Sequence, residues 1–235
     1  MDRMDKVREV AKMVGEENVQ VNEDILRDYS KDLHQKGVKP LCVVRLCDRD
    51  QVREIVRFAN ITQTPLIPVS SSPPRFRGDT VPLVPGTMVV DLSNLRKIID
   101  VDRKHRVALF EPGVTFDQLV PSLAAEGLVC NMPLMPKRGK SVVASLLERT
   151  PPVMPKYQWD ASDPLACLEI VFGNGEVFRT GQAAGPGTFE EQRKLGVAFN
   201  VPFGPGIMSI HRLVQGAQGT FGIVTWTSMR CEVKP

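Results

Sequence analysis

Apolar residues recur along this chain with two periods, one typical of helices and one typical of strands. Over the first turns the period is helical, and Gly15 suits the end of that helix. The apolar positions of this helix are Met4, Val7, Val10, Ala11 and Val14. A second short helix is expected over residues 22–29, before a charged loop. The amino-terminal region is therefore predicted to be helical.

Residues 40–69 have the pattern of a strand, a helix and a second strand. The run LCVVRL (residues 41–46) is apolar enough for a buried strand. Asp48, with Gln51 three residues later, forms the capping box that opens a helix, and residues 65–69 form the next strand. A helical crossover of this kind joins parallel strands. We therefore expect a small parallel α/β unit here.

The second half of the chain has further strand-like runs and one capped helix. Residues 88–92 (MVVDL) and 106–112 (RVALFEP) are expected to be strands separated by a polar turn. Thr115 and Gln118 form another capping box, and Gly127 suits the end of the helix that it opens. This helix is expected to flank the strands.

The clearest local pattern is a hairpin over LEIVFGNGEVFRTG (residues 168–181). Two alternating apolar runs enclose Gly173-Asn174-Gly175, which accept the positive φ of a tight turn. Residues 181–206 are rich in Gly, Pro and polar residues and are predicted to form a loop, and a strand follows over residues 223–226. The expected fold class is α+β, a small parallel subdomain followed by a larger, mainly antiparallel sheet with flanking helices.

Composition narrows the class of protein. The chain has 235 residues, 42% of them hydrophobic and 24% charged, which is ordinary for a globular protein of one large or two small domains. The net charge of 30 − 27 = +3 is too small to indicate nucleic-acid binding, and no basic stripe with aromatics is present. No apolar run reaches the ~18–20 residues of a membrane helix, and the amino end lacks a signal-peptide core. We expect neither a nucleic-acid partner nor a membrane span.

The positions of the cysteines and histidines indicate the cellular compartment and whether the chain binds a metal. The five cysteines are scattered and have no C-x-x-C spacing, which favours reduced thiols in a cytoplasmic protein over metal or redox duty. His34, His105 and His211 are far apart, so no zinc-type spacing exists and no metal site is expected. His105 and His211 are interpreted as a solvated and a structural residue, respectively.

The stretch PLIPVSSSPPRFRGDT (residues 65–80) has the most unusual composition. Serines and a glycine allow a ligand to approach the backbone, arginines favour an anion, and Pro73-Pro74 would hold the loop open. An ordinary surface turn is the alternative. Because the loop leaves the carboxyl end of a predicted parallel strand, where ligands bind in open α/β sheets, a binding role gains weight.

The order of several motifs resembles the FAD-binding domain of the vanillyl-alcohol-oxidase and para-cresol-methylhydroxylase (PCMH) family, with the glycolate-oxidase and D-lactate-dehydrogenase branch most similar. The motifs are weak singly and specific as an ordered series. They are ILRDYSKD (25–32), the loop at 68–80, MVVDLSNLRKIIDVD (88–102), ALFEPGVTFDQLVPSLAAEGL (108–128), LEIVFGNGEVFRTG (168–181) and GAQGTFGIVT (216–225).

The resemblance implies that the loop at 68–80 cradles the FAD pyrophosphate and that two later segments run along the cofactor. It also implies a helical lead-in over 1–37, a first FAD subdomain over 38–95, a second over 96–235, and a substrate-binding cap domain that this chain lacks. The implied FAD-binding residues are Pro68, Ser70, Ser71, Ser72, Arg75, Phe76, Arg77, Gly78, Asp79, Thr80, Ser141, Val142, Ala144, Ser145, Gly216, Gly219, Gly222, Ile223 and Val224.

Two segments depart from the family pattern. Serines 70–72 stand where glycines are common, and Pro73 and Pro74 can donate no N–H; serine hydroxyls and Arg75 or Arg77 could compensate. Alternatively the loop is a degraded site. In KSVVASLLER (140–149) Val143 and Ala144 replace family glycines, so this segment could also be plain buried chain. For Gly216, Gly219 and Gly222, turn-making alone is the alternative. Asp163 matches an acidic family position of doubtful role.

The resemblance implies an FAD-dependent oxidoreductase that oxidises a small molecule such as a 2-hydroxy acid, with the cap supplied by a partner subunit or by further chain. No histidine lies in the loop at 68–80, so non-covalent FAD is expected. A non-catalytic nucleotide-binding or interaction subunit on a decayed FAD fold is the second reading. A third is an NADPH-driven flavin enzyme of the cell-wall reductase type. No catalytic residue is assigned.

Overall fold

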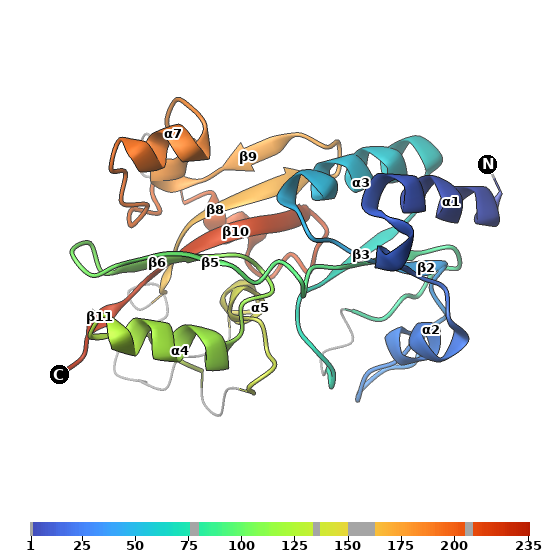
Figure 1. Ribbon diagram of the computed structural model, residues 1–235, viewed down its shortest axis with the longest axis horizontal. Helices are drawn as coiled ribbons and strands as arrows, with labels where there is room; N and C mark the ends of the chain where they lie inside the picture. Colours follow the sequence, from blue (N-terminus) through green and yellow to red (C-terminus); the bar gives the residue numbers. More distant parts are fainter. Residues whose placement is uncertain (1, 76–79, 134–136, 150–162, 205–208) are drawn as a thin grey trace. The chain divides into compact units, whose positions relative to one another are not determined.

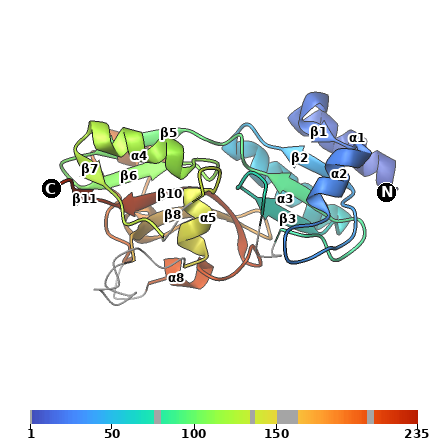
Figure 2. The ribbon, with the colours of Figure 1, turned by 90° about the horizontal axis from the view of Figure 1, so that it is seen from below.

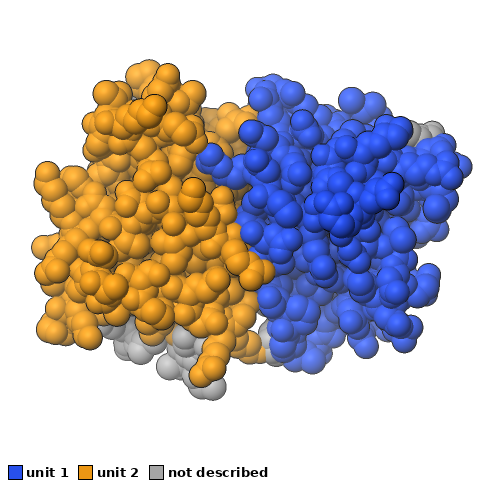
Figure 3. Space-filling view, viewed as in Figure 1, with its two compact units in different colours: residues 1–95, 171–176, 219–223 blue, residues 96–170, 177–218, 224–235 orange. Residues whose placement is uncertain are grey.

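The chain divides into two compact units (Figure 3). A four-stranded sheet lies in unit 1, and most of a five-stranded sheet lies in unit 2. The structure is a computed structural model that describes residues 2–75, 80–133, 137–149, 163–204 and 209–235. Unit 1 comprises residues 1–95, 171–176 and 219–223, and unit 2 comprises residues 96–170, 177–218 and 224–235.

Unit 1 is built on a four-stranded sheet. Its strands, in the order in which they lie, are β1 (Val19–Gln20), β2 (Cys42–Arg45), β4 (Met88–Asp91) and β3 (Leu66–Val69). Both β2 and β3 pair parallel with β4, whereas β1 pairs antiparallel with β2. The predicted parallel crossover from β2 through α3 (Arg49–Thr62) to β3 is confirmed. Strand β4 lies between β2 and β3 in the sheet.

Helices cover both faces of this sheet, α1 and α3 on one side and α2 on the other (Figure 1). The alternation along the strands explains the two faces. Cys42 and Val44 pack with the α1 and α3 side chains, whereas Val43 between them packs with Leu26 and Tyr29 of α2. The helical elements of unit 1 are α1 (Arg3–Val14), η1 (Glu16–Asn18), α2 (Glu23–Tyr29) and α3 (Arg49–Thr62).

Strand β3 lies at the edge of the sheet, and proline blunts that edge. The Met88 N–H donates to the Pro65 carbonyl at 2.8 Å and the Leu92 N–H donates to the Val69 carbonyl at 2.7 Å. Odd-numbered residues of β3 therefore turn their backbone toward β4, and Leu66 and Pro68 face the open edge. Since proline has no N–H, Leu66 supplies the edge-facing donor within β3, which limits pairing with another chain.

Unit 2 contains most of a five-stranded sheet. Its strands, in the order in which they lie, are β5 (Ile98–Asp102), β6 (Val107–Phe110), β10 (Gly222–Arg230), β8 (Leu165–Phe172) and β9 (Val177–Arg179). Strand β6 pairs antiparallel with both β5 and β10. The last residues of β8 and the first of β10 are counted in unit 1. The α+β class, with a mainly antiparallel second part, is confirmed.

Short helices and one extra strand pair complete unit 2. Figure 1 shows α4 and α7 on opposite sides of the five-stranded sheet. These elements are α4 (Phe116–Ala125), β7 (Leu128–Val129), α5 (Val142–Leu147), η2 (Gly181–Ala184), α7 (Phe189–Lys194), α8 (His211–Val214) and β11 (Glu232–Val233), which pairs antiparallel with β7.

An aromatic cluster holds α7 on this sheet. The Phe189 ring centroid lies 4.6 Å from that of Trp226 in β10 and 5.5 Å from that of Phe199. Phe199 and Trp226 meet edge to face at 5.7 Å. Since Trp226 and Phe199 are at most 1% exposed, the segment after β9 is part of the core.

Two predictions about elements are wrong in part. The stretch between MVVDL and RVALFEP contains a strand, β5, where only a polar turn was expected. Residues 181–206 contain η2 and α7, and α7 opens with a capping box of Thr188 and Glu191. The glycine and proline content of that segment masked a short helix that Phe189 anchors in the core.

The sequence predicts neither a membrane-spanning helix nor a metal site. Among the described residues, none of the helices has the length and apolar character to cross a bilayer. Within the same ranges, no group of His, Cys, Asp and Glu side chains gathers closely enough to hold a metal ion.

The predicted α3 capping box is present and gives a stability test. The Asp48 carboxylate accepts from the Asp50 N–H at 2.8 Å, and the Gln51 side chain accepts from the Asp48 N–H at 3.2 Å. Replacing Asp48 by alanine is expected to lower the free energy of unfolding by about 1 kcal/mol, because an N-terminal donor of the helix loses its acceptor. Urea denaturation measures this; Glu54→Ala, on the exposed side of the same helix, should change stability by less than about 0.5 kcal/mol.

Candidate functional site

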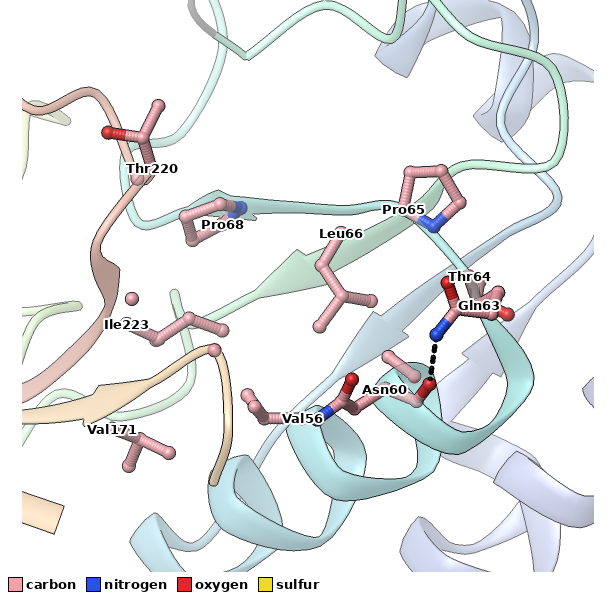
Figure 4. A pocket seen from close by; sticks show the side chains of 14 residues that line it. Val56, Asn60, Gln63, Thr64, Pro65, Leu66, Pro68, Val171, Thr220 and Ile223 are labelled. Carbon is pink, nitrogen blue, oxygen red and sulfur yellow. Dashed lines mark hydrogen bonds between the residues drawn. The ribbon is translucent and has the colours of Figure 1, made fainter. Parts of the chain in front are cut away.

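A cavity of about 360 Å³ lies in unit 1 beside the edge strand β3 (Figure 4). Its walls come from α3, from β3 and from the two short segments that unit 1 takes from β8 and β10. Figure 4 shows Val56, Leu66 and Ile223 directed toward this space, with Asn60, Gln63 and Thr220 adding polar groups around it. Four residues predicted to bind FAD contribute to the lining, namely Pro68, Gly219, Gly222 and Ile223.

Two of the predicted glycines permit close packing in unit 1. A Cβ on Gly219 would stand 2.9 Å from Cγ of Pro68, and a Cβ on Gly222 would stand 2.1 Å from the Val171 carbonyl oxygen. Both glycines also have positive φ, at 82° and 153°. Gly216 has a positive φ of 77° and open space where its Cβ would be, so its backbone conformation alone explains it. Turn-making is therefore not the whole role of Gly219 and Gly222.

A buried guanidinium is the second feature of unit 1. Arg75 is 8% exposed and stacks on Tyr29, with its guanidinium carbon 4.2 Å from the ring centroid. Its Nη1 has no hydrogen-bond partner among the described residues. A buried cationic donor without an acceptor is costly, so this donor is available to a ligand, an ion or a water molecule.

The carboxylate next to this ring is already engaged. Asp91 accepts a 2.6 Å hydrogen bond from the Tyr29 hydroxyl and a 2.9 Å bond from the Ser93 N–H, and Arg45 Nε lies 3.9 Å from it. Burial, followed by the Asp91 charge, raises the pKa of Tyr29, and Arg75 partly offsets this. The ring therefore stays a neutral platform that holds Arg75 in place.

These side chains gather where ligands bind in parallel sheets. Arg45 and Asp91 are the last residues of β2 and β4, and Arg75 belongs to the loop that leaves β3. All three parallel strands thus end in this region, which is the edge at which open α/β sheets bind ligands. With a guanidinium donor open, the arrangement suits an anion such as a phosphate.

The remaining loop residues are partly described. Ser70, Ser71 and Thr80 are half-buried and Ser72 is exposed, and the Thr80 hydroxyl has no hydrogen-bond partner among the described residues. The other predicted loop residues, Phe76, Arg77, Gly78 and Asp79, lie outside the described part of the chain.

The predicted residues at 141–145 form the start of α5 in unit 2. The Ser141 hydroxyl donates to the Pro112 carbonyl at 2.5 Å and accepts from the Ala144 N–H at 3.0 Å, so it caps the helix. Val142 and Ser145 are buried, and Ala144 is half-buried. These contacts cap α5 and pack its start into unit 2.

A polar cluster beside α5 was missed in the sequence. Gln215 Nε2 donates to Asp163 Oδ2 at 3.0 Å and to the Leu146 carbonyl at 3.2 Å, and the Gly216 N–H donates to the Leu147 carbonyl at 2.7 Å. The end of α8 therefore lies against α5, as Figure 2 shows. No motif marked Gln215, which directly follows α8 and has an extended backbone.

Several atoms of this cluster are buried without a partner. Among the described residues these are Ser145 Oγ, His211 Nδ1 and Gln215 Oε1. Burial lowers the pKa of His211, and the Asp163 carboxylate partly counteracts this. His211 is 2% exposed, and its Nδ1 is a ring nitrogen that can accept or donate one more hydrogen bond. Ile223 and Val224 at the start of β10 are also buried.

Comparisons with curated proteins give consistent relatives. The chain is 28% identical to the 4-cresol dehydrogenase [hydroxylating] flavoprotein subunit of Pseudomonas putida over 191 residues, 77% of this chain and 35% of that protein. It is 23% identical to the mitochondrial D-lactate dehydrogenase [cytochrome] of Arabidopsis thaliana over 95% of this chain and 36% of that protein. The chain thus spans about a third of the length of these relatives.

Solved structures agree on the fold. A crystal structure of p-cresol methylhydroxylase with substrate bound superposes with a TM-score of 0.81 at 25% identity, over 99% of this chain and 44% of that one. The model of the FAD binding domain family matches residues 40–181, which include both the loop after β3 and the β8–β9 hairpin. The resemblance seen in the motifs is confirmed, and FAD is the cofactor that these features specify. The chain belongs to the FAD binding domain family, with the PCMH-type fold.

Proposed function

We propose that this chain is the FAD-binding portion of a flavin-dependent oxidoreductase and that it holds FAD without a covalent bond. The observation that carries the proposal is Arg75, a buried arginine with an open donor, in the loop that follows β3. The family match and the oxidoreductase names of the relatives support it.

The residues of unit 1 fit the anionic part of FAD. A pyrophosphate brings negative charge and several acceptor oxygens, which a guanidinium binds well. Pro73 and Pro74 remove two N–H donors from the loop, and the Arg75 Nη1 donor can replace one of them. Stacking on Tyr29 holds the guanidinium in position before the ligand arrives, which reduces the entropy lost on binding.

The cavity beside β3 fits a flat apolar group. Val56, Leu66 and Ile223 provide apolar walls, and Asn60 brings an amide to the cavity. We assign this cavity to one of the two ring systems of FAD, because nucleotide sites pair an apolar slot with a few polar groups. Gly219 and Gly222 keep the wall in place by packing closely on Pro68 and Val171.

When bound, FAD supplies reversible acceptance of a hydride equivalent from substrate. The chain's own residues contribute binding and orientation: Arg75 neutralises phosphate charge, and the cavity excludes water from one ring. The absence of histidine from residues 68–80 supports non-covalent binding.

Substrate and partner are proposed from the relatives. A 2-hydroxy acid is supported by the names of the D-lactate dehydrogenase and of the glycolate oxidase subunit GlcD of Bacillus subtilis, and a 4-alkylphenol by that of the 4-cresol dehydrogenase. The words "flavoprotein subunit" in the last name support a partner subunit for this chain. The cytoplasmic location stays a prediction.

A non-catalytic nucleotide-binding subunit is the second candidate. It is favoured by α5, where Val142 and Val143 are at most 2% exposed and Ser141 bonds within the fold. A segment used in this way leaves fewer groups for a cofactor. The two candidates differ in whether bound flavin is reduced by substrate.

The first test is flavin binding. The purified chain is expected to show flavin absorption between about 350 and 500 nm, or to quench FAD fluorescence in a titration, because the cavity and Arg75 bind the cofactor. Acid precipitation should release all of the flavin into the supernatant, since the bond is non-covalent. A colourless chain that takes up no FAD would sink the proposal. Bleaching by D-lactate, glycolate or 4-cresol would distinguish the enzyme from the second candidate.

The second test removes the guanidinium. Arg75→Ala is expected to weaken FAD binding about 10- to 100-fold, because a charged hydrogen bond to phosphate is lost. Arg75→Lys should fall between this variant and the parent, as lysine keeps the charge without the planar fork. Fluorescence titration at two salt concentrations measures both.

The matched control for Arg75 is Arg8→Ala, which removes an exposed arginine of α1 whose Nη1 lies 3.6 Å from Asp5 Oδ1. Its affinity for FAD should equal that of the parent. Thermal denaturation of each variant shows whether it is folded. An Arg75→Ala chain that melts like the parent and binds FAD equally well would contradict the assignment.

A further inference from the structure

Two cysteines that are far apart in the sequence meet across the β7–β11 strand pair of unit 2. In that pair Glu232 lies opposite Val129, and Val233 lies opposite Leu128. The two strands run in opposite directions, so the residue before Glu232 faces the residue after Val129. These positions are Cys231 and Cys130, and both are free thiols.

The hydrogen bonds around the pair define its geometry. The Lys234 N–H donates to the Gly127 carbonyl at 2.9 Å, which makes positions 127 and 234 a hydrogen-bonded pair. The Cys231 N–H instead donates to the Arg106 carbonyl at 2.7 Å, away from β7. Alternation along the ladder thus makes Cys130 and Cys231 a non-hydrogen-bonded pair, the type with Cα atoms about 4.5 Å apart and side chains on one face. Disulfides span Cα separations of about 4.4–6.8 Å.

The thiols also influence each other. Burial raises the pKa of Cys231 to about 12, and the neighbouring Cys130 adds to the shift. Burial raises the pKa of Cys130 to about 11, and its side chain is only partly buried, whereas Cys231 is 6% exposed. Cys167, by comparison, donates from Sγ to the Val201 carbonyl at 3.3 Å. Within this pair, Cys130 is therefore the thiol that an oxidant reaches first.

We propose that Cys130 and Cys231 form an intramolecular disulfide when the chain meets a peroxide. The Cys130 thiolate attacks one peroxide oxygen, the O–O bond breaks, and Cys130 becomes a sulfenic acid as water leaves. The Cys231 thiolate then attacks the Cys130 sulfur, forms the S–S bond and releases a second water. Together, the two thiols lose two electrons and two protons as they form one disulfide. One molecule of hydrogen peroxide takes up both and becomes two waters.

The bond ties β11 to β7 and closes a long loop of chain. Closing a long loop restricts the unfolded chain, so the oxidised form of unit 2 gains stability. Because burial raises the pKa of Cys130, little of its thiol is ionised near neutral pH, so the reaction is slow and responds to sustained peroxide. The proposal is independent of FAD binding.

The test is a peptide map of the purified full chain after incubation with a small excess of hydrogen peroxide at about pH 8.5, where more thiolate is present. Remaining thiols are alkylated in denaturant before digestion. The expected product is a cross-linked peptide pair containing Cys130 and Cys231, lighter by two hydrogens than the free peptides. Dithiothreitol should separate the pair, and the melting temperature should rise on oxidation and fall again on reduction.

Matched variants separate this pair from the other cysteines. Cys47→Ser removes the exposed cysteine of unit 1 and should leave both the cross-link and the rise in melting temperature unchanged. Cys130→Ser should abolish both. The peptide map of the parent chain decides the matter even if a variant folds poorly. Full alkylation of Cys130 and Cys231 after peroxide treatment, or oxidation of Cys130 to sulfinic acid with Cys231 still free, would overturn the proposal.

Discussion

The parallel pairing of β2 and β3 with β4 is the constraint on which the rest of unit 1 depends. A strand that returns through α3 must run in the same direction as the strand before it, so all three strands end at one edge. This edge receives Arg45, Asp91 and the loop that carries Arg75. The direction of the strands brings these residues to one edge, and the sequence makes three of them charged.

Burying the charged Arg75 side chain is costly, and its contact with Tyr29 reduces that cost. A guanidinium buried beside a carboxylate would normally pair with it, but here Tyr29 and Ser93 occupy the Asp91 oxygens and Arg75 lies over the Tyr29 ring. Ring stacking stabilises the cation, and Nη1 has no hydrogen-bond partner within the described part of the chain. The fold therefore holds in place a charged donor that an anionic cofactor can complete, in a loop whose prolines offer few backbone donors.

In unit 2 the segment predicted to bind FAD, residues 141–145, is engaged in contacts within the fold. Ser141 caps α5 and bonds to Pro112, Val142 and Val143 pack inside, and Gln215 bonds to the helix carbonyl at Leu146. Where the family commonly has glycines that let a cofactor approach, this chain has a helix supported by side chains. The open polar atoms of this region belong instead to Ser145, His211 and Gln215.

Local sequence determined the elements whose signals lie within a few residues. Neighbouring residues decide the backbone chemistry of the capping boxes at Asp48 and Thr115, of the Gly-Asn-Gly hairpin and of the parallel crossover. The ordered motifs of the FAD-binding family could also be read from the sequence. The sequence-based prediction missed β5 and α7. For α7 a local signal was present, the capping box of Thr188 and Glu191, but the glycines and prolines around it indicated a loop. Its anchoring by Trp226 depends on a residue more than thirty positions away. Only the tertiary structure decided that Arg75 stacks on Tyr29, that Gly219 and Gly222 pack on Pro68 and Val171, and that Cys130 faces Cys231. These are contacts between distant segments, set by strand register and packing, which no local pattern encodes.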